Sequence, residues 1–352
     1  MLRVVHLSDF HFSEASEVDF ELHCLNPLIK DLQSINEIKA IDLIVFSGDL
    51  IDRGGINFKE GIKSAFEAFE QKVINPIITA LEMEKNKFIF VPGNHDIDRR
   101  ADKERIDNAL YNDLQSIEKI NEFIDANDLS DGASRIIPYK EFEKKYYMGT
   151  DHEITNFAST FKYSIAGVKI GVTGFNSSWR CYDSDKDKGK ILLGERQVAL
   201  ATQRLEECDL KIAVIHHPLD WFSSVERKQI TSMIYRNYNM MFCGHVHESE
   251  SFYTTSMFND GLFISTAPAN WSGNVRNKDR DFFNGYVYVD YNLSEAIVYN
   301  RRYDHLKGTY DPNNFFGDHE GKARYVFPTP NALKNIQKKM KQSIIFMQNI
   351  FL

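Results

Sequence analysis

The sequence predicts an α/β sandwich in which a second sheet packs on the first. Short apolar segments alternate with amphipathic helices over the first 91 residues, and short alternating strands fill the last third. Strands that are separated by helices favour a parallel sheet with right-handed crossovers. A chain of 352 residues with 43% hydrophobic and 26% charged residues can bury a substantial core, as one large domain or two small ones.

The first part of the chain supplies three strands and two long helices. Residues 18–38 and 58–84 carry apolar side chains at helical spacing, and Pro76 is expected to kink or split the second helix. The strands are the almost entirely apolar segments 4–7, 43–46 and 88–91.

Residues 98–160 interrupt this rhythm and are rich in charges of both signs. The apolar spacing predicts one helix over 106–124 and another over 138–147. We interpret the segment as an inserted helical cap over the substrate, with plain packing against the body as an equal alternative.

The remainder of the chain predicts a second set of strands with two helices among them. The helices are expected at about 194–207 and 225–237. The strands are expected at 161–165, 168–173, 210–215, 240–242, 251–255, 262–266, 286–291 and 296–300.

The last segment differs from the body, and we divide the chain into a domain of residues 1–328 and a tail of residues 329–352. Apolar residues from Leu333 to Phe351 recur every three or four positions, which predicts an amphipathic helix over 331–352. This helix is expected to dock on its own domain, or to hold a dimer or a partner domain, or to lead into a further domain.

Bulk properties exclude several classes of protein. The net charge of -8 argues against a protein that coats duplex DNA. No apolar run reaches the ~20 residues of a membrane span, and the N-terminus has no signal-peptide pattern. Because the cysteines form no CxxC pair, we expect free thiols in a reducing compartment. The cysteines are Cys24, Cys181, Cys208 and Cys243. A cytoplasmic protein is therefore expected.

Side chains of the types that bind divalent metals follow five apolar strands. Because the carboxyl ends of strands converge in an α/β sheet, we expect one shared site. Oxygen and imidazole donors suit Mn, Fe or Zn, and the absence of cysteine ligands argues against a structural zinc site. Two such ions ~3.5–4 Å apart can activate water and clamp a phosphate. The candidate ligands are Asp9, His11, Asp49, Asn94, His216, His245 and His247.

The glycines that precede Asp49, Asn94 and His245 are expected to let the backbone turn sharply into the site. In the second motif, Asp52 and Arg53 follow Asp49. Arg53 is expected to grip a phosphate oxygen, with a surface salt bridge as the alternative.

Two further clusters are candidates for binding substrate. The first follows the strand 168–173 and is predicted to line the pocket, with a simple turn as the alternative; it comprises Asn176, Ser177, Ser178, Trp179 and Arg180. The second is a basic and aromatic loop that is predicted to stack a base and hold a phosphate, with a solvated loop as the alternative; it comprises Asn270, Trp271, Arg276, Lys278 and Arg280.

The five motifs, read as D-x-H, G-D, G-N-H-D, H and G-H-x-H, resemble the calcineurin-like metallophosphoesterase superfamily. They frame residues 9–247, and the resemblance extends to about residue 328. Within the superfamily the sequence is most similar to bacterial cyclic-nucleotide-phosphodiesterase-like members. The resemblance implies a four-layer α/β/β/α sandwich with an inserted helical segment.

The resemblance also implies roles for individual residues. A metal-bridging hydroxide would attack phosphorus. His95 would stabilise the transition state or protonate the leaving group, with Asp96 orienting its ring or, alternatively, capping a helix, and His217 would be a supporting residue. Asp49 would bridge two divalent ions, with manganese favoured and iron or zinc as alternatives. The first ion would be held by Asp9, His11 and His247, and the second by Asn94, His216 and His245.

These expectations lead to a metal-dependent phosphoric ester hydrolase, with a phosphodiesterase favoured over a phosphatase. The substrate would be a small phosphodiester or a nucleotide. A DNA or RNA nuclease is the first alternative, although the acidic net charge disfavours it. From another class, the chain would be a regulatory or interaction module held through residues 331–352. Contact with a membrane is not expected.

Overall fold

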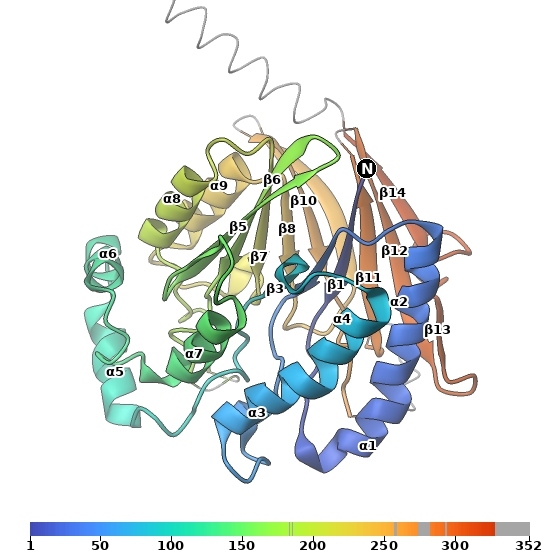
Figure 1. Ribbon diagram of the computed structural model, residues 1–352. Coiled ribbons are helices and arrows are strands. Elements are labelled where there is room, and N and C mark those ends of the chain that lie inside the picture. Colours follow the sequence, from blue (N-terminus) through green and yellow to red (C-terminus); the bar gives the residue numbers. More distant parts are fainter. Residues whose placement is uncertain (183, 185, 257–258, 274–281, 293, 328–352) are drawn as a thin grey trace, which may run out of the picture.

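The computed structural model describes residues 1–182, 184, 186–256, 259–273, 282–292 and 294–327 (Figure 1). The basic side chains Arg276, Lys278 and Arg280 and the predicted helix 331–352 lie outside the described residues. Two seven-stranded sheets with flanking helices form the body, as the sequence predicts.

The first sheet combines strands from both ends of the chain. Its order is β13-β12-β11-β1-β2-β3, and β14 pairs with β12. The three N-terminal strands run parallel, whereas β11 runs antiparallel to β1. The last strands therefore complete the first sheet instead of forming the second. The strands are β1 (Leu2–Leu7), β2 (Leu43–Phe46), β3 (Phe88–Phe90), β11 (Gly285–Tyr291), β12 (Glu295–Asp304), β13 (Thr309–Pro312) and β14 (Lys322–Val326).

The second sheet comes from the middle of the chain, in the order β4-β5-β6-β7-β8-β10-β9. Its central strands β6, β7, β8 and β10 are parallel, and antiparallel partners lie on both sides. The strands are β4 (Glu153–Ile154), β5 (Ala158–Ile165), β6 (Val168–Phe175), β7 (Leu210–Ile215), β8 (Met240–Cys243), β9 (Glu250–Ser256) and β10 (Asn259–Thr266).

Two long helices over the first sheet each contain a π turn. The π turn Glu21–Leu25 joins α1 (Glu17–Phe20) to α2 (Asn26–Ile38), and the π turn Glu70–Ile74 joins α3 (Ile62–Phe69) to α4 (Asn75–Leu81). Pro76 does not split its helix, contrary to one predicted outcome. It lies just after the π turn, at the start of α4, where a missing backbone N–H costs little.

The inserted segment contains three helices, α5 (Glu104–Asp113), α6 (Ile117–Ala126) and α7 (Ile137–Tyr146). The single helix predicted over 106–124 is wrong. The chain breaks before Ser116, whose hydroxyl caps the next helix by accepting a hydrogen bond from Lys119 N. Helix α7 packs on α3, and α6 packs on α8 (Glu195–Arg204). A role as a substrate cap stays a prediction.

The outer face of the second sheet is covered by α8 and by α9 (Arg227–Asn237), as Figure 1 shows. The four cysteines are buried and free. Among the described residues, no helix is long and apolar enough to cross a membrane.

Candidate metal centre

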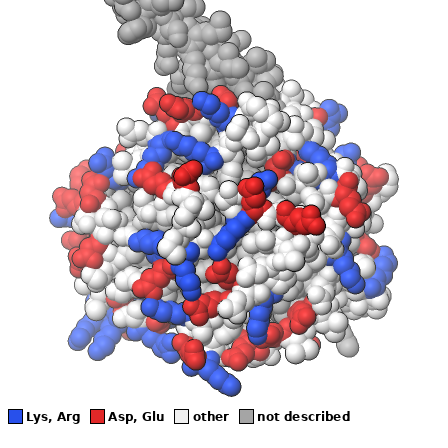
Figure 2. Space-filling model, viewed as in Figure 1, with Lys and Arg blue, Asp and Glu red and all other residues white. Residues whose placement is uncertain are grey.

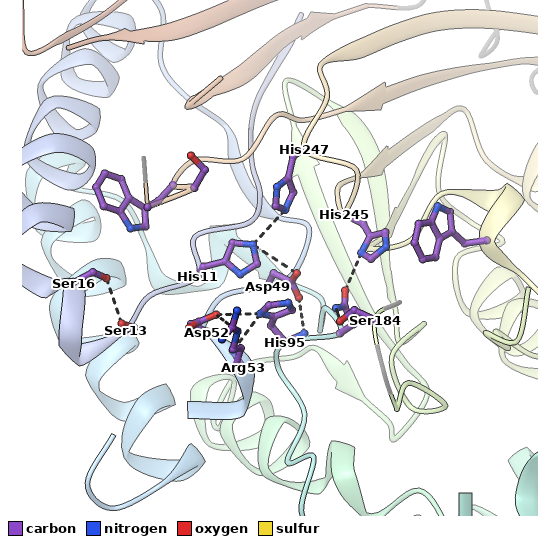
Figure 3. A pocket seen from close by; sticks show the side chains of 15 residues that line it. His11, Ser13, Ser16, Asp49, Asp52, Arg53, His95, Ser184, His245 and His247 are labelled. Carbon is purple, nitrogen blue, oxygen red and sulfur yellow. Dashed lines mark hydrogen bonds and ion pairs between the residues drawn. The ribbon is translucent and has the colours of Figure 1, made fainter. Parts of the chain in front are cut away.

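Four of the five motifs line one cavity of about 670 Å³, which Figure 3 shows from close by. His216 of the remaining motif is buried next to it, with Nε2 3.1 Å from Asn94 Oδ1. Three motifs follow the carboxyl ends of β1, β2 and β3 in the first sheet, and two follow β7 and β8 in the second. The cavity therefore lies where the two sheets meet. The structure brings together all seven candidate ligands.

The first cluster consists of Asp9, His11 and His247. Asp9 Oδ1 lies 3.2 Å from His247 Nε2 and 3.9 Å from His11 Nε2. The two imidazole nitrogens are 3.3 Å apart. Asp9 Oδ1 is buried and has no hydrogen-bond partner among the described residues, so this oxygen is free to serve as a ligand.

The second cluster consists of Asn94, His216 and His245. Asn94 Oδ1 lies 3.1 Å from His216 Nε2 and 2.8 Å from His245 Nδ1. These two nitrogens are 3.2 Å apart. One amide oxygen and two imidazole nitrogens thus converge on a common point.

Asp49 lies between the two clusters. Its Oδ2 atom is 3.9 Å from His11 Nε2 in the first cluster and 3.5 Å from His216 Nε2 in the second. One carboxylate oxygen therefore faces donors of both clusters, which is the position that a bridging ligand requires.

Hydrogen bonds on the far side of these ligands fix their orientation. Asp49 Oδ1 accepts a hydrogen bond from His95 N at 2.8 Å, which leaves Oδ2 for the cavity. His216 Nδ1 donates to Ser47 O at 2.7 Å, so Nε2 is the nitrogen that a metal would bind in place of a proton. Asn94 Nδ2 donates to Ser184 Oγ at 2.7 Å, which turns the amide oxygen towards the histidines.

Backbone strain is concentrated at the same residues. Nine described residues other than glycine have a positive φ, and five of them are candidate ligands: Asp9, His11, Asp49, His245 and His247. A left-handed backbone costs roughly 1–3 kcal/mol at such residues and persists where the surroundings over-determine it, commonly at functional sites.

The glycines of the motifs make room for the ligands. A Cβ atom on Gly93 would lie 2.0 Å from Asp49 Oδ1, and one on Gly244 would lie 1.9 Å from Ser8 Oγ. Of the three motif glycines, only Gly48 has the positive φ that a sharp turn requires. Close approach, more than turning, explains the other two.

Attraction between the carboxylates and the neighbouring histidines keeps the carboxylates ionised. Burial opposes ionisation of Asp49, but the neighbouring His216 and His95 hold its pKa well below the usual range. Burial likewise opposes the charge on His216, yet Asp49 and Asp9 raise its pKa to about 9. Burial lowers the pKa of His245 to about 3 and of His11 to about 4. Asp9 and Asp49 therefore stay ionised at the place where a cation would bind, and a cation there would compete with the proton on His216.

The donors fit two divalent ions. Four imidazole nitrogens, two carboxylates and one amide oxygen form two adjoining sets, and the buried Asp9 oxygen awaits a partner. Such nitrogen and oxygen donors suit Mn, Fe or Zn, and the donor set does not choose among these metals.

The carboxylate beside His95 is Asp52, and the predicted contact with Asp96 is wrong. His95 Nδ1 lies 3.3 Å from Asp52 Oδ1. Burial lowers the pKa of His95, but Asp49 and the hydrogen bond to Asp52 outweigh it and raise the pKa.

Asp96 does not contact the His95 ring. It also does not cap a helix, because no helix begins at this residue. Its carboxylate accepts hydrogen bonds from the backbone N–H groups of Leu50, Ile51 and Gly93 at 3.2, 3.1 and 2.8 Å. Asp96 therefore ties the second motif to the third.

Three of the predicted substrate residues lie away from the cavity. Asn176 is buried and its side chain bonds to backbone groups. Trp179 stacks on Phe123 of α6, with ring centroids 5.1 Å apart. Arg180 forms a buried ion pair with Asp107 of α5 at 2.5 Å. Trp179 and Arg180 therefore anchor the inserted helices.

The neighbouring serines of that cluster also support the body. Ser177 Oγ lies 2.8 Å from Nδ1 of the buried His217, and Ser178 Oγ donates to Pro92 O. His217 is next to the second cluster, within reach of His216 and His245.

Other predicted residues do line the cavity. The Arg53 side chain is 70% exposed there and lies 4.0 Å from Asp52, a distance at which it is still free to meet an anion. Trp271 lies beside the first cluster, where its backbone N–H donates to Asp9 O at 3.2 Å. The neighbouring Asn270 is buried and bonds to Ser8 O through its backbone.

Sequence reasoning missed Trp221 and Ser184. The Trp221 ring lies 4.0 Å from the His245 ring and lines the cavity on the side of the second cluster. Its place three residues after the His-His-Pro motif is the available signal. Ser184 gave no signal, because a lone serine in a loop is common.

Comparisons with known proteins found matches in sequence and in structure. The Bacillus subtilis (strain 168) protein "Uncharacterized metallophosphoesterase-like protein YydB" is 23% identical over 358 aligned positions, which cover 96% of this chain and 67% of that protein. Haemophilus influenzae NAD nucleotidase (NadN) is similar in structure, with a TM-score of 0.42 and 11% identity; the match covers 82% of this chain and about half, 47%, of that chain.

Two further solved structures also match. A conserved uncharacterized protein of Streptococcus pneumoniae, a predicted phosphoesterase, has a TM-score of 0.34 at 10% identity, covering 92% of this chain and 97% of that chain. Entamoeba histolytica Vps29 complexed with zinc has a TM-score of 0.32 at 12% identity, and the match covers 93% of this chain and 99% of that chain. The profile of the calcineurin-like phosphoesterase family matches residues 2–249, and the chain belongs to this family.

Proposed function

We propose that this protein is a dinuclear-metal phosphoester hydrolase that acts on phosphodiesters. The observation that carries the proposal is the position of Asp49 Oδ2 between His11 Nε2 and His216 Nε2, at 3.9 and 3.5 Å. A carboxylate that faces two sets of nitrogen and oxygen donors is what a pair of divalent ions requires. Such a pair lowers the pKa of water and stabilises charge on phosphate oxygens.

Side chains in and beside the cavity would hold the ions, bind the phosphate and protonate the leaving oxygen. One ion would be held by Asp9, His11 and His247. The other ion would be held by Asn94, His216 and His245, and Asp49 would bind both ions. Arg53 extends into the cavity and would bind a phosphate oxygen. His95, steadied by Asp52, would donate a proton or a hydrogen bond to the leaving oxygen.

The shape of the cavity supports a diester. Its volume of about 670 Å³ falls in the range of pockets that bind whole small molecules, so it has room for much more than a phosphate group. The backbone of the buried Trp271 flanks the first cluster, and the Trp221 ring flanks the second. A substrate with an organic group on each side of phosphorus would use both flanks. Cyclic nucleotides and nucleic-acid strands remain candidate diesters.

The test compares bis-p-nitrophenyl phosphate with p-nitrophenyl phosphate, using metal-stripped protein resupplied with Mn²⁺, Fe²⁺ or Zn²⁺. We expect metal-dependent cleavage of the diester, and loss of at least a hundredfold in kcat for Asp49→Asn. Asp125→Asn is the matched control, because its carboxylate is half exposed on α6 and pairs, among the described residues, with Arg196. Two bound ions without hydrolysis of either ester or of DNA would contradict the proposal and favour a regulatory module.

A further inference from the structure

A buried row of hydroxyl groups lies behind the first cluster. His6 Nε2 is 2.9 Å from Ser47 Oγ, Ser47 Oγ is 2.8 Å from Ser8 Oγ, and Ser8 Oγ is 2.5 Å from Asp9 Oδ2. All four residues are fully buried. The row begins on β1, crosses to the end of β2 and returns to the end of β1.

The direction of every proton in this row follows from its end. An ionised carboxylate only accepts hydrogen bonds, so the Ser8 hydroxyl must donate to Asp9. Ser8 has then spent its proton and must accept from Ser47, and Ser47 in turn must accept from His6 Nε2. The proton of His6 is therefore fixed on Nε2, and His6 Nδ1 is buried without a partner among the described residues.

We propose that His6, Ser47 and Ser8 form a positioning relay that turns the free oxygen of Asp9 towards the first metal position and sets the metal affinity of that position. The inference rests on the proposed function, since it assigns supporting residues to the same centre. Aligned hydrogen bonds polarise one another, so each member strengthens the next. With Oδ2 held by Ser8 and by the backbone N–H of His245 at 3.2 Å, only Oδ1 is left for a metal.

The surrounding packing is built around the relay. A Cβ atom on Gly244 would lie 1.9 Å from Ser8 Oγ and 3.1 Å from Ser47 Oγ, so this glycine leaves the space that the two hydroxyls occupy. The His6 ring packs against Phe242 at 4.8 Å, which holds it in place. Ser47 also accepts from His216 Nδ1, but through its backbone carbonyl, which a side-chain substitution keeps.

The test measures the binding of Mn²⁺ to metal-free protein by calorimetry and by electron paramagnetic resonance. Asn94→Ala removes a ligand of the second position and keeps the first intact, whereas His247→Ala removes a ligand of the first position and keeps the second intact. Each of these two variants therefore reports on the binding of one ion. We expect Ser8→Ala to raise the Kd of the first position by about 10–100-fold, the usual effect of removing a group that orients a ligand, and to leave the second within threefold. Ser47→Ala and His6→Phe should follow with progressively smaller increases.

Thr173→Val is the matched control, because it also removes one buried hydroxyl, which lies 3.0 Å from Tyr238 Oη and away from both clusters. His6→Phe keeps an aromatic ring against Phe242, so it tests the relay even if a serine variant folds poorly. Equal weakening of both positions, or unchanged affinity at the first, would overturn the relay. A wild-type protein that binds no pair of ions would instead overturn the proposed function, so the two failures are distinguishable.

Discussion

Two carboxylates in the motifs have different tasks, and the difference can be measured. Asp52 contacts the His95 ring, whereas Asp96 accepts three backbone hydrogen bonds. We expect Asp52→Asn to lower kcat by about tenfold or more with little change in stability, because it weakens a general acid that is worth 10²–10⁴. Asp96→Asn should instead lower the free energy of unfolding by about 1–3 kcal/mol, because its amide leaves a backbone donor unpaired.

Steady-state kinetics and urea denaturation of both variants check this assignment. A stable Asp96→Asn protein with greatly reduced kcat, beside an Asp52→Asn protein with normal kcat, would restore the role that the motif resemblance implies for Asp96.

A single methyl group at Gly93 should disable the centre. Its Cβ would lie 2.0 Å from Asp49 Oδ1 and 2.3 Å from Asp49 N, so the ligand loop must move. We expect Gly93→Ala to lose at least one of the two bound ions, as measured by elemental analysis of the purified protein.

Gly149→Ala is the control for that substitution. Apart from its chain neighbours, no atom of the described residues would lie within 4 Å of a Cβ added at Gly149, but the φ of +83° makes the alanine strained. It should cost about 1 kcal/mol of stability and keep both ions. Two ions in Gly93→Ala would show that the loop has more freedom than its packing indicates.

At the scale of elements, the strands that carry the motifs could be predicted because they combine an apolar run with a polar end. The structural role of residues 176–180 could not be predicted in this way. It also follows a strand, but Trp179 and Arg180 meet Phe123 and Asp107, which lie more than fifty residues earlier on the inserted helices. Local sequence does not reveal such distant partners. The same limit hid the pairing of β11 with β1.

The anchoring role of Arg180 leads to an element-scale prediction. Arg180→Met removes a buried partner of Asp107, whose carboxylate keeps Arg135 at 3.3 Å. We expect a loss of about 3 kcal/mol, at the low end for a broken buried pair, and faster hydrogen exchange in α5 and α6. Metal binding should not change. Loss of substrate affinity with normal exchange would return Arg180 to the substrate pocket.

For the whole molecule, the centre lies between two halves that each supply part of it. The first sheet provides Asp9, His11, Asp49 and Asn94, and the second provides the three remaining histidines. Around the body, basic and acidic side chains are intermixed on the face shown in Figure 2. The two sheets share one hydrophobic core, and at one edge they also meet at the ligands.

This arrangement predicts that metal ions hold the two sheets together. An ion that binds only the folded protein stabilises it by about 2.7 kcal/mol at a hundred times its Kd. We expect Mn²⁺ to raise the Tm of the stripped protein by several degrees, and a chelator to reverse the change. Differential scanning calorimetry checks this, with Asp49→Asn as the variant that should show a much smaller shift. An equal shift in Asp49→Asn would mean that the ions stabilise the fold from another place, and the two sheets would then be joined by their core alone.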